Sequence, residues 1–183
     1  MSISIFTQTI RAKIANQHNI LSVEKEEYKI KITDTGIVPT ESYRKFSTDR
    51  AIFKIYIVKH NSTILYVGMT KQRISVRFGQ SFRAYKQKLV TGESNSRGDS
   101  GYKWILKHRN TEDHLELFVF PFSDETEKHN IEAVEAEIAF LVKIQTGRWP
   151  ECQNEIHFHN IDGVNADKQA KAILKIVCNW DLD

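Results

Sequence analysis

Two short apolar runs separated by a polar turn constrain the fold of this chain more than any other feature. The runs, at residues 51–59 and 64–67, are rich in β-branched and aromatic side chains, and the residues between them, 60–63, are polar. This pattern is typical of two antiparallel strands joined by a tight turn. The sequence therefore predicts a β-hairpin that ends just before Gly68.

After the hairpin the pattern becomes helical. From about residue 73, apolar residues recur at spacings of four, four, three and four, which stack on one helix face: Ile74, Phe78, Phe82, Tyr85 and Leu89. Further along we expect a polar loop at 91–101, a short helix at 102–108, a strand at 114–122, a long helix at 127–145 ending at Gly147, and a final helix at 166–177. The N-terminal part is harder to assign, with a short helix expected at 9–15 and a strand at 27–33.

The length and composition suit a single compact domain. The chain has 183 residues, of which 40% are hydrophobic, enough to bury a core. No run approaches the roughly 20 apolar residues that cross a bilayer, and the N-terminus lacks the basic-then-apolar order of a signal peptide. Two cysteines are too few for a disulfide framework. We therefore expect a globular, cytoplasmic protein with no membrane partner.

Charge is unevenly distributed along the chain. Residues 69–110 carry ten basic residues against two acidic ones, whereas residues 111–183 carry six basic and fifteen acidic. A polyanion such as nucleic acid should approach the first segment and be repelled by the second. The alternative is that these cations are only the solvated faces of two helices.

Two tyrosines stand in the hairpin strands. If the turn takes three residues, 60–62, Tyr56 lies directly opposite Tyr66 on one face of the pair; a four-residue turn places them on opposite faces. Both could also be ordinary half-buried strand residues. Gly68, at a strand end before a basic helix, would let a phosphate backbone approach closely.

Arginines on the following helix lie near this hairpin. With Ile74 at zero and about 100° per residue, the apolar face spans about 20° to 80° and Arg77 falls near 300°. Arg77 thus flanks the buried face and can lean toward the sheet. Arg73 points further toward solvent, where a non-scissile phosphate would lie. The alternative for Arg77 is a snorkelling surface arginine.

The long helix carries three glutamates that a helical wheel separates. With Val134 at zero, the apolar residues span about 280° through 0° to 80°. Glu137 falls near 300°, inside that stripe, while Glu135 lies near 100° at its edge and Glu132 near 160° in solvent. A carboxylate on an apolar face is costly unless it is paired or binds a metal. Glu137 is therefore predicted to be a metal ligand or the partner of a buried arginine.

In this order, these residues resemble the GIY-YIG endonuclease family over residues 52–155. The matching positions are Lys54-Ile55-Tyr56, Tyr66-Val67-Gly68, Arg77, Glu137 and Asn154. The resemblance implies an α+β fold with a small three-stranded antiparallel sheet flanked by helices. It also implies hydrolysis of a DNA phosphodiester with one divalent ion, Mg²⁺ or another such as Mn²⁺.

The resemblance also implies roles for individual residues. Glu137 would hold the metal, Tyr56 would deprotonate the attacking water or otherwise act at the nucleophile, and Tyr66 would position water or phosphate. Arg77 would stabilise the pentacovalent phosphate, for which its fixed charge suits it. The residues expected to contact nucleic acid are Gly68, Lys71, Arg73, Arg83 and Asn154.

Two positions depart from the family pattern. Lys54 stands at the first motif glycine, where we expect it to affect packing rather than chemistry. Ser81 stands where some members have a histidine, which increases the demand on Tyr56 or a metal-bound water as the base.

These inferences predict an N-terminal extension (1–50), a nuclease domain (51–155) and a C-terminal helical tail (156–183) packed on the same domain. The predicted function is a metal-dependent endonuclease that acts on DNA, as a homodimer if both strands are cut. One alternative is a non-catalytic nucleic-acid-binding module that retains the nuclease fold. Another is a protein-interaction domain that uses the acidic C-terminal third.

Overall fold

A computed structural model describes about half of the chain. The described residues are 9–11, 31–33, 52–74, 76–77, 80–81, 83–84, 91–92, 103–104, 115–122, 126–153, 156 and 164–182. Their architecture is α+β, as predicted, with a three-stranded antiparallel sheet and two long helices.

The central sheet has the order β4-β3-β5. Its strands are β3 (Lys54–His60), β4 (Thr63–Thr70) and β5 (Leu115–Pro121). The hairpin partner β4 and the more distant β5 both pair with β3, so β3 is hydrogen-bonded on both sides. The hairpin and the third strand predicted from the apolar runs are confirmed.

The hairpin register differs from the one expected from a three-residue turn. His60 pairs with Thr63, so only Asn61 and Ser62 form the turn, and Asn61 takes a left-handed φ of 52°, which asparagine tolerates. The register then shifts, because Lys59 pairs with Ile64 and Val58 with Tyr66, so Leu65 is left as a β-bulge.

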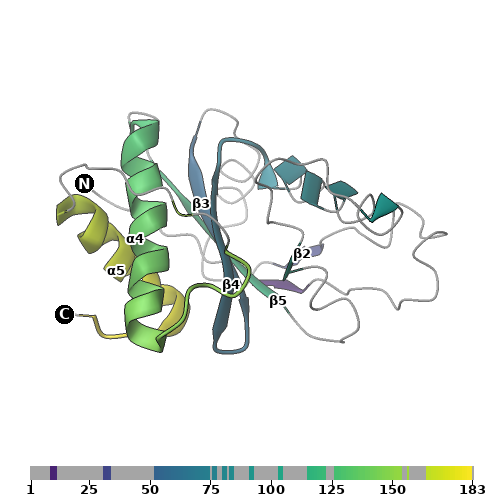
Figure 1. The fold of residues 1–183 in the computed structure, drawn as a ribbon. Helices are drawn as coiled ribbons and strands as arrows, with labels where there is room; N and C mark the ends of the chain where they lie inside the picture. The colour runs from purple at the N-terminus through teal and green to yellow at the C-terminus, as the bar shows by residue number, and fades with distance from the viewer. Residues whose placement is uncertain are drawn as a thin grey trace.

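Two long helices cover one face of the sheet. They are α4 (Lys128–Thr146), which ends on the left-handed Gly147, and α5 (Val164–Cys178), and they lie side by side in Figure 1. The core contains alternate residues of the strands together with the buried faces of both helices. The strand residues in this core are Ile55, Ile57, Ile64, Val67, Phe118 and Phe120.

The opposite face of the sheet faces the helical segment that follows β4. Residues 74, 76–77, 80–81 and 83–84 have helical backbone, and Figure 1 shows these teal segments across the sheet from α4. Ile74, Ser81 and Ala84 of this segment are buried, as is Trp104. The sheet is thus covered on both faces, and this second face carries Tyr56 and Tyr66.

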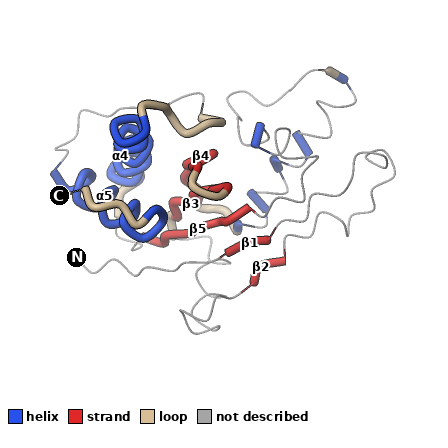
Figure 2. Tube along the Cα trace, turned by 90° about the horizontal axis from the view of Figure 1, so that it is seen from below, coloured by secondary structure: helices blue, strands red, loops and turns tan. Residues whose placement is uncertain are grey.

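The N-terminal part contributes a two-stranded sheet. Strands β1 (Thr9–Arg11) and β2 (Lys31–Thr33) pair antiparallel, with β1 near β5 in Figure 2. The helix expected at 9–15 is therefore wrong at its start, because pairing with β2 gives this segment a strand conformation. The expected strand at 27–33 is confirmed at 31–33.

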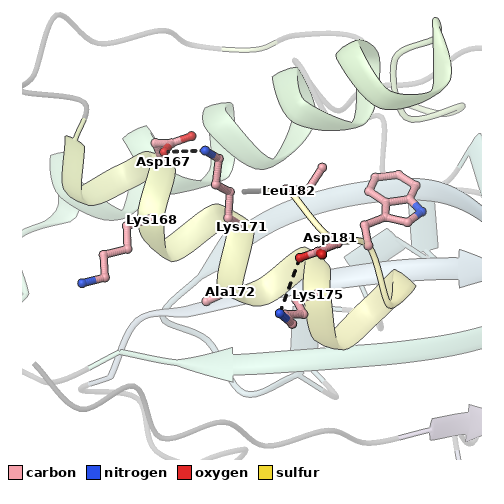
Figure 3. Close-up of a pocket in the computed structure, with 8 residues that line it drawn as sticks. Asp167, Lys168, Lys171, Ala172, Lys175, Asp181 and Leu182 are labelled. Atoms are coloured by element: carbon pink, nitrogen blue, oxygen red, sulfur yellow. Dashed lines mark ion pairs between the residues drawn. The ribbon is translucent and has the colours of Figure 1, made fainter.

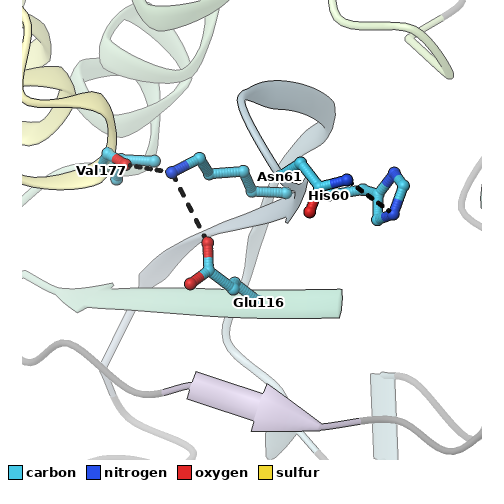
Figure 4. A network of polar contacts seen from close by, with 5 residues as sticks. His60, Asn61, Glu116 and Val177 are labelled. Atoms are coloured by element: carbon cyan, nitrogen blue, oxygen red, sulfur yellow. Dashed lines mark hydrogen bonds and ion pairs between the residues drawn. The ribbon is translucent and has the colours of Figure 1, made fainter. Parts of the chain in front are cut away.

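Lys59 ties together three elements at one end of the sheet (Figure 4). Its Nζ donates a hydrogen bond to the carbonyl of Val177 at 2.9 Å and lies 3.5 Å from the Glu116 carboxylate. The last carbonyls of a helix lack partners within it, and a lysine satisfies one of them here. This contact fixes the C-terminal end of α5 on the sheet.

Among the helices that the structure describes, none is long and apolar enough to cross a membrane.

Candidate functional site

Tyr56 and Tyr66 lie on the same face of the sheet, but not directly opposite each other. Tyr56 pairs with Gly68, and Tyr66 pairs with Val58, so the two rings meet diagonally. Their centroids are 5.8 Å apart with the planes tilted by 34°. Tyr56 is 2% exposed and Tyr66 7% exposed, so the pair is buried beneath the neighbouring helical segment.

Gly68 makes room for this pair. A Cβ atom built at Gly68 would lie 2.6 Å from Cζ and from the hydroxyl oxygen of Tyr56, and 2.6 Å from Cε1 of Tyr66. Contacts this short are sterically forbidden, so no larger residue fits while both rings stay in place. The structural reason for this glycine is therefore packing of the two phenols. Its predicted contact with a phosphate stays a prediction.

Arg77 holds the hydroxyl of Tyr56. The guanidinium Nε donates a hydrogen bond to the Tyr56 oxygen at 3.0 Å. The backbone N–H groups of Val76 and Arg77 both donate to the carbonyl of Arg73 at 3.0 Å, which forms the first helical turn after β4. Arg77 is partly exposed, and its predicted lean toward the sheet is confirmed.

Burial changes the acid–base properties of Tyr56. Desolvation raises its pKa well above the usual 10, and neighbouring Tyr66 raises it further, while Arg77 opposes the shift. The neutral phenol is therefore the stable form at physiological pH. As a neutral group Tyr56 can donate a hydrogen bond to a water or phosphate oxygen, but it is a poor base by itself.

Glu135 is the carboxylate that lies near this pair. Its pKa is raised from 4.5 to about 7, first by burial and then by the charge of Glu132, while Arg77 and a hydrogen bond from the backbone N–H of Met69 oppose the rise. Glu135 also contributes to the raised pKa of Tyr56. These mutual effects place Glu135, Arg77 and Tyr56 in one electrostatic cluster.

The edge of β4 explains how a residue of α4 reaches this cluster. The N–H groups of Val67 and Met69 point to the same side because the residues are two apart. The Val67 N–H donates to Oε1 of Gln153 at 3.2 Å, and the Met69 N–H donates to Glu135. Two side chains thus cover the outer edge of β4, and Glu135 sits at its end nearest Arg77.

The structure does not bring Glu137 to the cluster. Its pKa is raised by burial and by Asp167 and lowered by Lys171, which are both residues of α5. Asp167 and Lys171 form an ion pair of 3.2 Å on the wall of a groove of about 350 Å³ that runs along α5 to Trp180 (Figure 3). The glutamate predicted to hold the metal therefore lies beside α5 instead.

The helical wheel favoured Glu137 because it gave the buried face of α4 the wrong centre. Ile144, counted as part of the apolar stripe, is 64% exposed, while Ala136 and Ala139 are 4% and 1% exposed. With Val134 at zero, the buried residues run from 0° to about 200°, and Glu135 near 100° lies in the middle of that arc. Small alanines where α4 packs closely were the signal that could have identified Glu135.

The predicted nucleic-acid residues lie around the Arg77 end of the cluster. Lys71, Arg73 and Arg83 are exposed, and Nζ of Lys71 is held 4.2 Å from the ring centroid of Phe53. Lys71 directly follows β4, and Arg73 and Arg83 belong to the segment that carries Arg77. We call these three exposed cations the basic edge. Asn154 falls outside the described residues.

The two departures from the family pattern are both buried. Lys54 is fully buried and its Nζ donates to the carbonyl of Ile52 at 2.9 Å. Ser81 is 3% exposed on the helix that carries Arg77. The burial of Lys54 agrees with the expected packing role.

A divalent ion at this cluster would bind the carboxylate oxygens of Glu135. A second carboxylate, that of Glu132, lies one helical turn away on α4. Mg²⁺ is commonly held by one or two carboxylates together with substrate phosphates and waters. Within the described part of the chain, no group of three or more His, Cys, Asp or Glu residues is placed to hold a metal.

Comparisons of the chain with protein-family models, with curated proteins and with solved structures each give no match.

Proposed function

We propose that this protein is a metal-dependent endonuclease that hydrolyses DNA phosphodiester bonds in the cytoplasm. The single observation that carries the proposal is the hydrogen bond of 3.0 Å from Arg77 Nε to the hydroxyl of Tyr56, next to the half-buried carboxylate of Glu135. A fixed cation can stabilise the charge that develops on the phosphate, a neutral phenol can orient a water, and a carboxylate can hold a metal ion, which together would support in-line attack on a phosphodiester. The order of Tyr56, Tyr66 and Arg77 along the chain, which resembles that of GIY-YIG endonucleases, supports the same proposal.

Each of the three groups would have a distinct task. Arg77 would place the fixed positive charge of its guanidinium beside the non-bridging phosphate oxygens, whose negative charge grows in the transition state. Tyr56, kept neutral by burial, would orient the attacking water through its hydroxyl. Tyr66 would keep the Tyr56 ring in place through the contact between the two rings.

The carboxylate of Glu135 fits a hard divalent cation such as Mg²⁺ or Mn²⁺. It lies on a rigid helix and its position is fixed by the backbone N–H of Met69. A bound ion would supply positive charge next to the phosphate and lower the pKa of a coordinated water. In this proposal Glu135 takes the role that the sequence assigned to Glu137.

The second candidate is a DNA-binding module without catalytic activity. The exposed cations Lys71, Arg73 and Arg83 favour DNA binding whether or not cleavage occurs. The basic edge alone therefore does not distinguish an enzyme from a binding module. The distinction rests on the cluster of Tyr56, Arg77 and Glu135.

One experiment separates the two candidates. Purified protein is incubated with supercoiled plasmid and Mg²⁺, and in parallel with a labelled duplex in a gel-retardation assay. The nuclease proposal expects nicked or linear plasmid that disappears with a chelator. If the duplex is retarded and the plasmid stays intact, the binding module is correct. If DNA is neither bound nor cut, both are wrong.

A further inference from the structure

The helix that carries Arg77 has an exposed face of unusual composition. With Arg77 at zero and about 100° per residue, Ala84, Ser81 and Ile74 lie between about −20° and +60° and are buried. Four other described residues lie between about −40° and −120°. We call these four, Arg73, Val76, Gln80 and Arg83, the reading face.

The reading face is open to solvent. Arg73 and Arg83 are exposed, Val76 is 40% exposed, and Gln80 is partly exposed. A β-branched apolar residue such as Val76, set between two arginines on the solvent side of a helix, does not contribute to the core. Arginine, glutamine and a small apolar side chain are the residue types that recognise guanine, adenine and the thymine methyl group.

We infer that the reading face enters the major groove of duplex DNA and makes cleavage sequence-dependent, with Gln80 and Val76 as the specificity-determining residues. The inference rests on the proposed function and names its substrate class. In this arrangement Arg73 and Arg83, at the two ends of the face, lie near phosphates or guanines on either side.

The position of Arg77 links the reading face to the cleavage site. Arg77 and the reading face belong to one helix and differ by 40° to 120° in direction, so a duplex whose phosphate contacts Arg77 has to pass the reading face. At the helical rise of about 1.5 Å per residue, the separation of Arg73 and Arg83 along the chain corresponds to about 15 Å, or about four base pairs at 3.4 Å each.

The geometry favours duplex DNA over duplex RNA. The major groove of B-DNA is about 12 Å wide and accepts an α-helix, whereas the deep, narrow major groove of A-form RNA does not. The helical segment lies outside the sheet, on the side opposite α4 and α5 (Figure 1), so neither of these helices blocks its approach to a groove.

Binding selection tests this inference independently of cleavage. Wild-type protein in EDTA is used to select from a pool of duplexes that carry a randomised segment of about eight base pairs. We expect an enriched motif of about four base pairs. Gln80→Ala should reduce the preference at one position about tenfold, and Val76→Ala should relax a neighbouring position. Gln145→Ala, which removes an exposed glutamine on α4, should leave the motif unchanged.

Three results would overturn the inference: no enriched motif, a motif that neither variant at the reading face changes, or tighter binding of single strands or RNA than of duplex DNA. A cleavage assay in Mg²⁺ then tests the proposed nuclease function separately from the reading face. Cutting without sequence preference refutes the reading face and leaves the nuclease proposal intact. If the protein selects a motif but does not cut DNA, the reading face is supported and the nuclease proposal is refuted.

Discussion

Arg77 donates its Nε hydrogen to the hydroxyl of Tyr56 at 3.0 Å, so a residue of the helix after β4 is fixed on a phenol of the central strand. This single bond connects the basic edge to the buried tyrosine pair. It also orients the guanidinium, because the group is planar and its Nε–H points at the Tyr56 oxygen.

Replacing Arg77 by lysine tests that orientation. Arg77→Lys keeps the charge but loses the planar fork and the Nε–H donor. We expect single-turnover cleavage to fall on the order of 100-fold, with the Kd for duplex DNA within about threefold of wild type. If the Kd weakens as much as the rate falls, Arg77 contributes only to binding.

Glu135→Gln and Glu137→Gln form a matched pair on one helix. We expect Glu135→Gln to reduce cleavage on the order of 100-fold, because only Glu135 lies in the cluster with Arg77 and Tyr56. Glu137→Gln should stay within about threefold of wild type, since its neighbours are Asp167 and Lys171. The reverse ranking in a single-turnover assay would return the role to Glu137.

The pKa of Glu135 should appear in the pH dependence of stability. Because its pKa is about 7 in the folded protein and 4.5 in the unfolded chain, the native state binds a proton more strongly. The free energy of unfolding should therefore fall as pH rises from about 4.5 to about 7, by on the order of 3 kcal/mol, and then level off. Urea denaturation of wild type and Glu135→Gln measures the effect. Parallel pH curves for the two proteins would contradict the assignment.

Magnesium should stabilise the folded protein through Glu135. At ten times its Kd, an ion that binds only the native state adds about 1.4 kcal/mol to the free energy of unfolding. For a chain of this size that raises Tm by about 4 °C. Thermal unfolding at pH 8 should show the rise in wild type and Glu137→Gln, and not in Glu135→Gln. An equal rise in all three would place the ion elsewhere.

Gly68→Ala should disturb the tyrosine pair. The added Cβ would lie 2.6 Å from atoms of both rings, so we expect a loss of about 2 kcal/mol in the free energy of unfolding. Tyr66→Ala removes one of the two rings and leaves space into which the Tyr56 ring can move away from the methyl group. In the double variant the losses should therefore sum to less than the two single losses, as measured by urea denaturation. Fully additive losses would mean that the glycine is not required by this contact.

Much of the framework was predictable from the sequence because its signals are local. The β-branched runs indicated β3 and β4, and helical periodicity with Gly147 gave α4 nearly to the residue. The start of the N-terminal segment was misassigned as a helix, because pairing between β1 and β2 is not a local property. The buried face of α4 was centred wrongly for a similar reason, since α4 packs on both β4 and α5.

The sequence by itself determined that two tyrosines stand in a hairpin and that Arg77 flanks the buried face of the helix that follows. It did not determine that the tyrosines share a face. A two-residue turn alone would pair Tyr56 with Val67 and place Tyr66 on the other side of the sheet. The bulge at Leu65 adds one residue to β4 and restores the shared face. At this bulge the Cys152 N–H donates a hydrogen bond to the Leu65 carbonyl. Contacts of this kind join residues that are far apart in the sequence, so only the tertiary structure contains them.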